Sequence, residues 1–221
     1  AQGMKIEFNV LDRQFRQFQD EYEAAALRAL RSGWYILGKE LEAFEQEYAA
    51  FNESKYCVGV GSGLDALVLA FRALGVGPGD EVLVPANTFI ASVMGVTLNG
   101  ATPVFVEPDE FYLLDAARLK AAITPRTRAI LPVHLYGQIC DMDPILEVAR
   151  RHNLFVVEDC AQAHTARYKG KMAGTFGDIG CFSFFPTKNV GAFGDAGCIV
   201  TDNPDLADKV RTLRNYGSKV K

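Results

Sequence analysis

The sequence lacks the long apolar run that a membrane-spanning helix requires, because charged or turn residues interrupt every apolar stretch after a strand-sized length. It also lacks an excess of positive charge, since 23 Lys and Arg against 27 Asp and Glu give a net charge of −4. That balance argues against general binding to nucleic acid or to acidic membranes. The five cysteines are widely spaced, and no pair has the spacing of zinc ligands. We therefore expect reduced thiols in a cytoplasmic protein and no metal site.

Residues 4–54 have the pattern of a helical segment. No basic stretch followed by an apolar run precedes them, so a signal peptide is not expected, and residues 1–3 are interpreted as a remnant of cloning. The first predicted helix ends near Gly33, and the apolar loop 34–38 separates it from a second helix. The apolar residues at helical spacing in the first helix are Phe15, Phe18, Tyr22 and Ala25. We expect this segment to pack on a larger domain, residues 55–221.

Short apolar strands alternate with helical patterns after residue 54. The predicted strands are Tyr56–Val60, Glu81–Val84, Pro103–Val106, Ala129–Val133, Leu154–Val157, Gly180–Phe184 and Cys198–Thr201. A last helix is predicted from Pro204 to Leu213. Repeated β-α-β units imply an α/β fold, with a mainly parallel sheet that helices cover on both faces. Ligands bind such sheets beyond the carboxyl ends of the strands, which directs attention to the loops that follow them.

Two of these loops contain residues suited to an anionic cofactor. Residues 61–67, GSGLDAL, lie between a strand and a helix, where small residues let backbone N–H groups approach a phosphate; a plain capped turn explains the same pattern. Asp159 ends a buried strand, where a carboxylate can keep a pyridinium nitrogen protonated; the alternative is an Asp that caps the next turn. Either segment alone is weak evidence, so both alternatives stay open at this point.

The segment around Lys188 is the most informative part of the sequence. Apolar and turn residues precede this lysine, and three glycines follow within residues 191–197. A lysine beside strand ends can form a Schiff base once its amine is deprotonated, whereas most lysines are solvated surface groups. Together with Asp159 and residues 61–67, the lysine completes a phosphate cradle, an acid and an amine on one edge of the predicted sheet.

These segments resemble the DegT/DnrJ/EryC1/StrS-type sugar aminotransferase family of fold-type I pyridoxal-phosphate enzymes. The resemblance runs from about residue 6 to the end and rests on several long ungapped segments. They are GWYILG, GSGLDAL, GPGDEVLVPANTFIAS, PVHLYGQ, VVEDCAQAH, GDIGCFSFFPTKNVGAFGDAG and LRNYG. The family fold has a seven-stranded sheet sandwiched by helices. Relatives continue into a smaller C-terminal domain, so we expect that domain to be missing from these 221 residues.

The resemblance implies a role for each matching residue. Lys188 takes the position of the lysine that binds pyridoxal 5'-phosphate as a Schiff base and then transfers the proton. Asp159 matches the partner of the pyridinium nitrogen, and Gln162 matches the residue at the ring hydroxyl. Phe89 matches the aromatic stacked on the ring. The implied phosphate ligands are the amides of Gly63 and Leu64 and the hydroxyl of Ser183. No role was found for His152 or His164, and His134 was interpreted as a structural group near the pocket.

The family implies transfer of an amino group, with glutamate as donor, to a dTDP- or UDP-linked keto-sugar in amino-sugar and lipopolysaccharide biosynthesis, by a homodimer. The stretch KNVGAFGDAG after the lysine resembles the 3-keto branch, and a 4-keto substrate is the alternative. A dehydratase relative would have histidine at position 188. A flavodoxin-like nucleotide-binding module is another alternative, but Lys188 would have no role in such a protein. A non-catalytic truncated relative is the remaining alternative.

Overall fold

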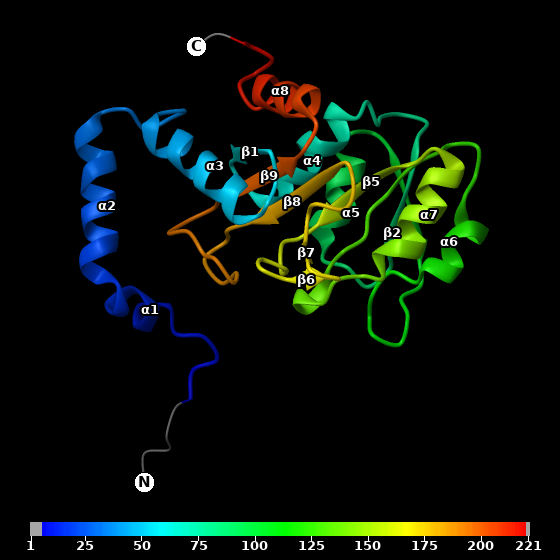
Figure 1. The fold of residues 1–221 in the computed structure, drawn as a ribbon, viewed down its shortest axis with the longest axis horizontal. Coiled ribbons are helices and arrows are strands. Elements are labelled where there is room, and N and C mark those ends of the chain that lie inside the picture. The colour runs from blue at the N-terminus through cyan, green and yellow to red at the C-terminus, as the bar shows by residue number, and fades with distance from the viewer. Residues whose placement is uncertain (1–5, 220–221) are drawn as a thin grey trace. The chain divides into compact units, whose positions relative to one another are not determined.

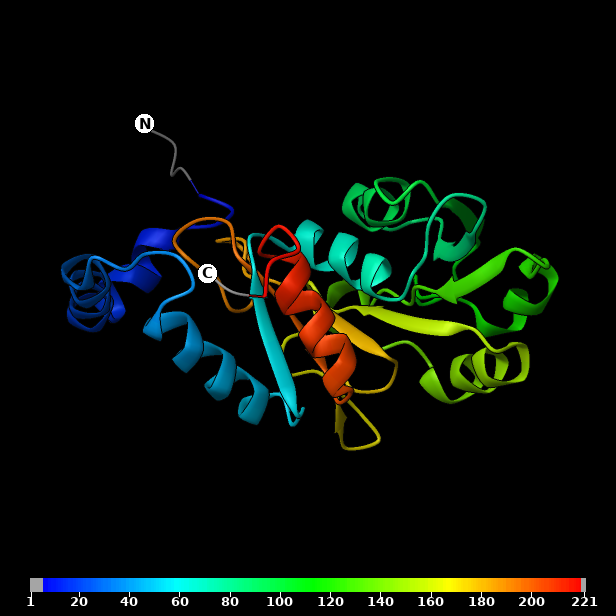
Figure 2. The ribbon, with the colours of Figure 1, turned by 90° about the horizontal axis from the view of Figure 1, so that it is seen from above.

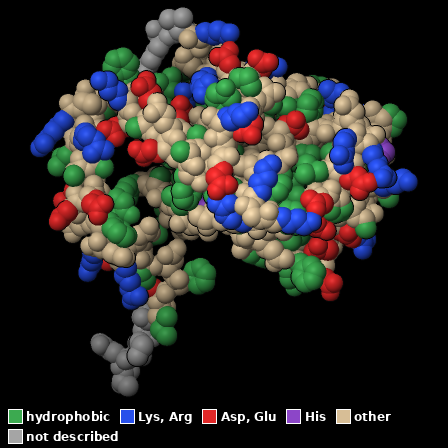
Figure 3. All heavy atoms as spheres, viewed as in Figure 1, with side chains coloured by type: hydrophobic (Ala, Val, Ile, Leu, Met, Phe, Trp, Pro, Cys, Tyr) green, Lys and Arg blue, Asp and Glu red, His purple; other side chains and the backbone are tan. Residues whose placement is uncertain are grey.

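The computed structural model describes residues 6–219, so the remnant of cloning predicted at residues 1–3 lies outside the described residues. The chain divides into two compact units, Ala1–Phe44 and Glu45–Lys221. Within residues 6–219, no helix is long and apolar enough to cross a membrane. On the face seen in Figure 3, side chains of Lys and Arg are interspersed with those of Asp and Glu. That pattern agrees with the small net charge of the sequence.

The smaller unit is helical, as predicted. It contains α1 (Leu11–Gln17), α2 (Gln19–Ser32) and the start of α3 (Lys39–Phe51). The single helix expected through Phe15 and Tyr22 is interrupted at Phe18, whose φ of −127° lies outside the helical region. The predicted end at Gly33 is confirmed, because this glycine adopts φ 65° and donates its N–H to the carbonyl of Leu30. The larger unit begins within α3, and Tyr48 and Ala49 of this helix are buried in it.

The larger unit is built on a seven-stranded sheet of order β1-β9-β8-β5-β4-β2-β3 (Figure 1). Its strands are β1 (Tyr56–Val60), β2 (Glu81–Pro85), β3 (Thr102–Val106), β4 (Thr127–Ile130), β5 (Phe155–Asp159), β8 (Ile179–Ser183) and β9 (Gly197–Thr201). All pairs are parallel except those of β9, which runs against both β1 and β8. The predicted mainly parallel sheet is confirmed. The fourth strand ends at Ile130 rather than Val133, because only isolated pairings continue beyond it.

Helices cover both faces of this sheet. They are α4 (Gly63–Ala73), α5 (Ile90–Thr97), α6 (Ala116–Ala122), α7 (Met142–His152) and α8 (Pro204–Leu213). Figure 2 shows α7 on the opposite side of the strands from α4. Alternation along β2 explains the two layers, since Val82 and Val84 join the core under α4, α5 and α8, whereas Leu83 joins the core under α6 and α7. Both cores are fully buried, and they fix the sheet edge from which the site loops extend.

A small hairpin after β5 had no counterpart in the predictions. Strands β6 (Arg167–Tyr168) and β7 (Lys171–Met172) form a small antiparallel hairpin of their own. Its turn consists of Lys169 and Gly170, which both have positive φ, at 51° and 82°. Two-residue strands are too short to show an alternating pattern, so no sequence signal predicts them.

Candidate functional site

The predicted site residues lie at or after the carboxyl ends of four strands of the seven-stranded sheet. Gly63 and Leu64 follow β1, Phe89 follows β2, Asp159 and Gln162 lie at or after the end of β5, and Ser183 and Lys188 at or after the end of β8. The strand β9 starts at this same edge, because it is antiparallel and Gly197 pairs with both Val60 and Ser183. The fold therefore brings all seven predicted residues to the edge of the sheet where ligands of α/β proteins bind.

The N-terminus of α4 presents unpaired amides. Ser62 caps the helix, and its hydroxyl accepts a hydrogen bond from the N–H of Asp65 at 3.0 Å. The first backbone donor that finds a helical acceptor is Ala66, which bonds to the carbonyl of Ser62. In the described part of the chain, the N–H groups of Gly63 and Leu64 have no acceptor. Two free amides at a helix N-terminus suit a phosphate group.

Glycine is required at Gly63, which provides one of the two amides, and at Gly197, which lies next to it. A Cβ on Gly63 would lie 2.6 Å from Cβ of Ser183, and a Cβ on Gly197 would lie 2.8 Å from the nitrogen of Gly63. Any larger residue would push the strand ends apart or cover the amide. The two glycines therefore keep a cradle open beside the Ser183 side chain, which is itself buried.

Asp159 is held by neutral donors. Its carboxylate is 6% exposed and accepts a hydrogen bond from the Ser92 hydroxyl at 2.7 Å on Oδ2 and from the Ala161 N–H at 3.1 Å on Oδ1. Among residues 6–219, no Lys or Arg nitrogen forms an ion pair with it. A nearly buried carboxylate with no cationic partner is able to accept a cation from a ligand.

Gln162 and Phe89 lie on the loops that flank Asp159. The Gln162 Oε1 accepts the N–H of Tyr136 at 2.7 Å, which leaves its amino group as a donor. Phe89 is 72% exposed and directly precedes helix α5. An exposed aromatic at this position is available to a flat ligand. The structure thus brings both side chains to the edge where Asp159 ends its strand.

Lys188 lies half-buried on the loop that leaves β8. The loop is closed by backbone hydrogen bonds, from Lys188 N–H to the carbonyl of Phe185 and from Ala192 N–H to the carbonyl of Phe184. A Cβ on Gly191 would lie 2.3 Å from the carbonyl oxygen of Pro186, so the close turn needs glycine there. The loop therefore has a defined shape from which the lysine extends.

His164 is a site-supporting residue that the sequence analysis missed. It is 2% exposed, its Nε2 donates to the Ser183 carbonyl at 2.8 Å, and its Nδ1 accepts from the Tyr48 hydroxyl at 2.8 Å. Burial lowers the pKa of His164, and the positive charge of Lys188 adds to the effect, so the ring is neutral. The only sequence signal was its place in VVEDCAQAH, five residues after Asp159.

His134 is structural, as expected. Its Nδ1 accepts the N–H of Cys140 at 3.2 Å, and its Nε2 donates to Glu158 at 3.0 Å. His134, Glu158 and Cys160 offer ligand atoms within 4.8 Å of one another, which is close enough for a metal ion. However, Glu158 is already surrounded by four donors, and burial raises the pKa of Cys160 to about 12, which disfavours the thiolate that binds metals. We therefore interpret the cluster as a hydrogen-bonded network.

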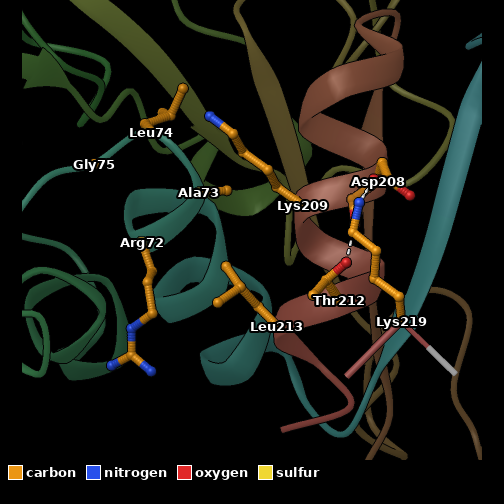
Figure 4. A pocket seen from close by; sticks show the side chains of 9 residues that line it. All are labelled: Arg72, Ala73, Leu74, Gly75, Asp208, Lys209, Thr212, Leu213 and Lys219. Carbon is orange, nitrogen blue, oxygen red and sulfur yellow. Dashed lines mark hydrogen bonds and ion pairs between the residues drawn. The ribbon is translucent and has the colours of Figure 1, made fainter. Parts of the chain in front are cut away.

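A separate pocket lies between the C-terminal end of α4 and α8, at the far end of α4 from Gly63 (Figure 4). Its lining includes Arg72, Lys209 and Lys219. Figure 4 shows the charged ends of Arg72 and Lys209 pointing away from each other, and Lys219 pairs with Asp208 at 3.3 Å. Because these charges do not converge on one point, this pocket is a poor candidate for the functional site.

Known proteins match this sequence and this fold. The family model described as the DegT/DnrJ/EryC1/StrS aminotransferase family matches residues 16–221. A dTDP-3-amino-3,4,6-trideoxy-alpha-D-glucose transaminase from Streptomyces venezuelae is 53% identical over 100% of this chain and 59% of its own length. A UDP-N-acetyl-3-dehydro-alpha-D-glucosamine 3-aminotransferase from Acidithiobacillus ferrooxidans is 51% identical over 92% of this chain and 56% of its own.

A solved structure agrees closely with the model. The crystal structure of S. venezuelae DesV in complex with a ketimine intermediate superposes with a TM-score of 0.97 at 53% identity, covering 99% of this chain and 59% of that one. The chain thus spans about 59% of the length of these relatives. A family match that extends over residues 16–221 covers nearly the whole sequence. The chain therefore belongs to the DegT/DnrJ/EryC1/StrS aminotransferase family.

Proposed function

We propose that the whole protein is a pyridoxal-phosphate-dependent aminotransferase that acts on a keto-sugar nucleotide, with the cofactor bound at the edge described above. The observation that supports this most directly is the grouping of Asp159, Lys188 and two unpaired amides at one sheet edge. The relatives in the comparisons are named as transaminases of dTDP- and UDP-linked amino sugars. Because the chain spans only part of their length, the activity belongs to the complete protein.

The residues at the edge offer the donors, acceptor and amine that suit pyridoxal 5'-phosphate. The amides of Gly63 and Leu64 suit its phosphate, and the Ser183 hydroxyl borders the same cradle. Asp159 offers a carboxylate without an internal cation to the ring nitrogen, a hydrogen bond worth roughly 1.5–3 kcal/mol. Phe89 offers a stacking face, and the amino group of Gln162 offers a donor to the ring hydroxyl. Lys188 would hold the group covalently through Nζ.

The bound cofactor supplies an electron sink that lets a proton leave the carbon next to the reacting nitrogen. Asp159 keeps the ring nitrogen protonated, because a nearby negative charge favours the protonated form. Once the amino donor has displaced Lys188 from the cofactor, the free amine of Lys188 would take up the proton at Nζ and return it to the neighbouring carbon. The glycine-lined cradle and Phe89 fix the orientation, and an error of about 1 Å there would cost roughly a hundredfold in rate.

We infer a 3-keto sugar substrate for the complete enzyme. The stretch KNVGAFGDAG after Lys188 supports this choice, as do the 3-amino sugars named for the similar relatives. We propose glutamate as the amino donor and a dTDP- or UDP-linked acceptor, in cytoplasmic synthesis of an amino sugar for a polysaccharide such as lipopolysaccharide. Product NMR from the full-length enzyme, offered 3-keto and 4-keto substrates, tests the position of the new nitrogen. Amination only at C4 would contradict it.

We further propose that the enzyme is a homodimer. In the smaller unit, helices α1 and α2 contain no buried residue, and the side chains of Leu30, Tyr35 and Ile36 are exposed. Exposed aromatic and aliphatic side chains at this density are typical of a protein interface. Sedimentation of the full-length enzyme is expected to give a dimer. A fully active monomer at micromolar concentration would contradict the proposal.

Covalent labelling tests the cofactor site on the chain itself. We expect borohydride reduction with pyridoxal phosphate, followed by peptide mapping, to mark Lys188. The variant Lys188→Ala should lose the label, whereas the control Lys171→Ala should keep it, because Lys171 lies exposed on β7. A label on another lysine, or no label at all, would show that Lys188 does not hold the cofactor.

A further inference from the structure

Ser92 is a buried hydroxyl that the proposed reaction has not yet used. It lies on the first turn of α5, is 1% exposed, and its Oγ lies 2.7 Å from Oδ2 of Asp159. A carboxylate has no proton to give, so the Ser92 hydroxyl must be the donor in this pair. Its single proton is thereby committed to Asp159.

Thr88 completes a chain of two hydroxyls. Its Oγ1 lies 2.7 Å from Oγ of Ser92. The Ser92 hydroxyl already donates its only hydrogen to the hydrogen bond with Asp159, so in the second pair Thr88 must be the donor and Ser92 the acceptor. The order of donation is therefore Thr88 to Ser92 to Asp159. Each donation polarises the next hydroxyl, so the two bonds reinforce each other.

The two hydrogen-bonded hydroxyls of Thr88 and Ser92 set the direction of the Asp159 carboxylate. The terminal torsion of an Asp side chain is soft, so a carboxylate held at one oxygen can turn. Here the Ala161 N–H holds Oδ1 and Ser92 holds Oδ2, so both oxygens are placed. The backbone on either side is fixed as well, since the Asp159 N–H bonds to the Pro132 carbonyl and the Asp159 carbonyl accepts the His134 N–H.

The turn that contains Thr88 and Ser92 also carries Phe89, the aromatic side chain that we propose stacks on the cofactor ring. Phe89 lies between Thr88 and Ser92, which are four positions apart and joined across the start of α5. The turn after β2 therefore links the ring-face side chain to the acid at the end of β5. We propose that Thr88 and Ser92 are positioning residues that hold Asp159 in line with the ring nitrogen of pyridoxal phosphate, an inference that rests on the proposed function.

The test compares two variants of Thr88 that separate the loss of the hydroxyl from the loss of side-chain volume. Thr88→Val removes the hydroxyl and keeps the shape, whereas Thr88→Ser keeps the hydroxyl. Ser92→Ala removes the last donor. Each chain is loaded with pyridoxal phosphate labelled with ¹⁵N in the ring, and the ¹⁵N chemical shift at neutral pH reports whether the ring nitrogen is protonated. Cofactor affinity is measured in parallel by fluorescence titration.

We expect Ser92→Ala and Thr88→Val to shift the ¹⁵N signal toward the unprotonated nitrogen, with Ser92→Ala weakening cofactor binding about tenfold, the scale of one hydrogen bond to a charged group. Thr88→Ser should resemble the parent chain in both measurements. Parent-like signals in Ser92→Ala and Thr88→Val, or a Thr88→Ser variant as disturbed as Thr88→Val, would overturn the positioning role. If borohydride mapping of the parent chain finds no cofactor on Lys188, the proposed function fails, and this inference fails with it.

Discussion

Two neighbouring carboxylates at the end of β5 have opposite surroundings. Glu158 accepts hydrogen bonds from His134 and from the N–H groups of Gly174, Phe176 and Gly177, all between 2.8 and 3.0 Å. Asp159 accepts only from Ser92 and Ala161 in the described part of the chain. Both groups are nearly inaccessible to solvent. One acid is thus saturated by the protein, while the other retains acceptor capacity for a ligand.

The difference separates a structural acid from an acid that is able to bind a ligand. Glu158 ties the loop 174–177 and His134 to β5, and its two oxygens already accept four hydrogen bonds. Asp159 faces the other side of the strand, as alternation along β5 requires. The unsaturated carboxylate is therefore the one suited to bind a cationic ring. The predictions below test this division, from the largest expected effect to the smallest.

Glu158→Gln is expected to destabilise the folded chain strongly. The side-chain amide of Gln would place an NH₂ group where one of the two Glu158 oxygens now accepts hydrogen bonds. The buried donors at that position would therefore lose their acceptor. Breaking a buried charged network of this kind costs about 3–5 kcal/mol. The free energy of unfolding from urea titration of the cofactor-free chain measures the effect. The exposed Glu147→Gln, which loses only a surface pair with Arg151, serves as control and should cost less than about 1 kcal/mol.

Asp159→Asn is expected to spare stability and impair chemistry. The amide still accepts from Ser92 or Ala161, so the free energy of unfolding should change by less than about 1 kcal/mol. The neutral side chain cannot keep the ring nitrogen protonated, and loss of one such electrostatic contact costs about a hundredfold or more in rate. Half-reaction rates of the full-length enzyme with glutamate check this. A near-normal rate would assign Asp159 a structural role like that of its neighbour.

His164 is expected to make the chain less stable in acid. Its folded pKa lies below the ordinary value of about 6.5, so only the unfolded chain takes up a proton as the pH falls below that value. Stability from this residue is complete above about pH 6.5 and falls by up to about 1.4 kcal/mol per pH unit until the folded pKa is reached. Urea titrations at several pH values should show a shallower acid slope for His164→Asn.

The cysteine beside Glu158 is expected to be inert. Burial raises the pKa of Cys160 to about 12, and all five cysteines are buried. Native protein treated with iodoacetamide at neutral pH should therefore gain no mass, whereas unfolded protein should gain five adducts. Rapid labelling of Cys160 in the native state would show that the region around Glu158 opens easily, contrary to the saturated network described here.

Much of the fold could be predicted from the sequence. Each of the seven predicted strands exists, because buried parallel strands are short apolar runs between turn residues. The last helix has the predicted bounds, with Asn203 as its cap and Pro204 in its first turn. The hairpin β6–β7 and the interruption at Phe18 were not predicted, since two-residue strands and a single distorted helical residue leave no periodic signal.

The supporting residues of the site were harder to predict. Ser92 is separated from Asp159 by 67 positions, and His164 from Tyr48 by 116. A buried serine and a lone histidine are common in protein cores, and neither has a spacing that indicates a site. The loop residues around Lys188 were recognisable because a lysine among apolar residues and glycines is unusual.

The sequence by itself determined the alternation of strands and helices, the family, and the residue types of the site edge. Only the tertiary structure decided which of two adjacent acids is saturated. Glu158 and Asp159 look alike in the sequence, but the pleat of β5 turns them to opposite faces. Glu158 meets donors from other loops, whereas Asp159 meets one hydroxyl from a helix turn and the N–H of Ala161. The number of donors around each carboxylate depends on which distant segments pack against it, and no local sequence pattern encodes that packing.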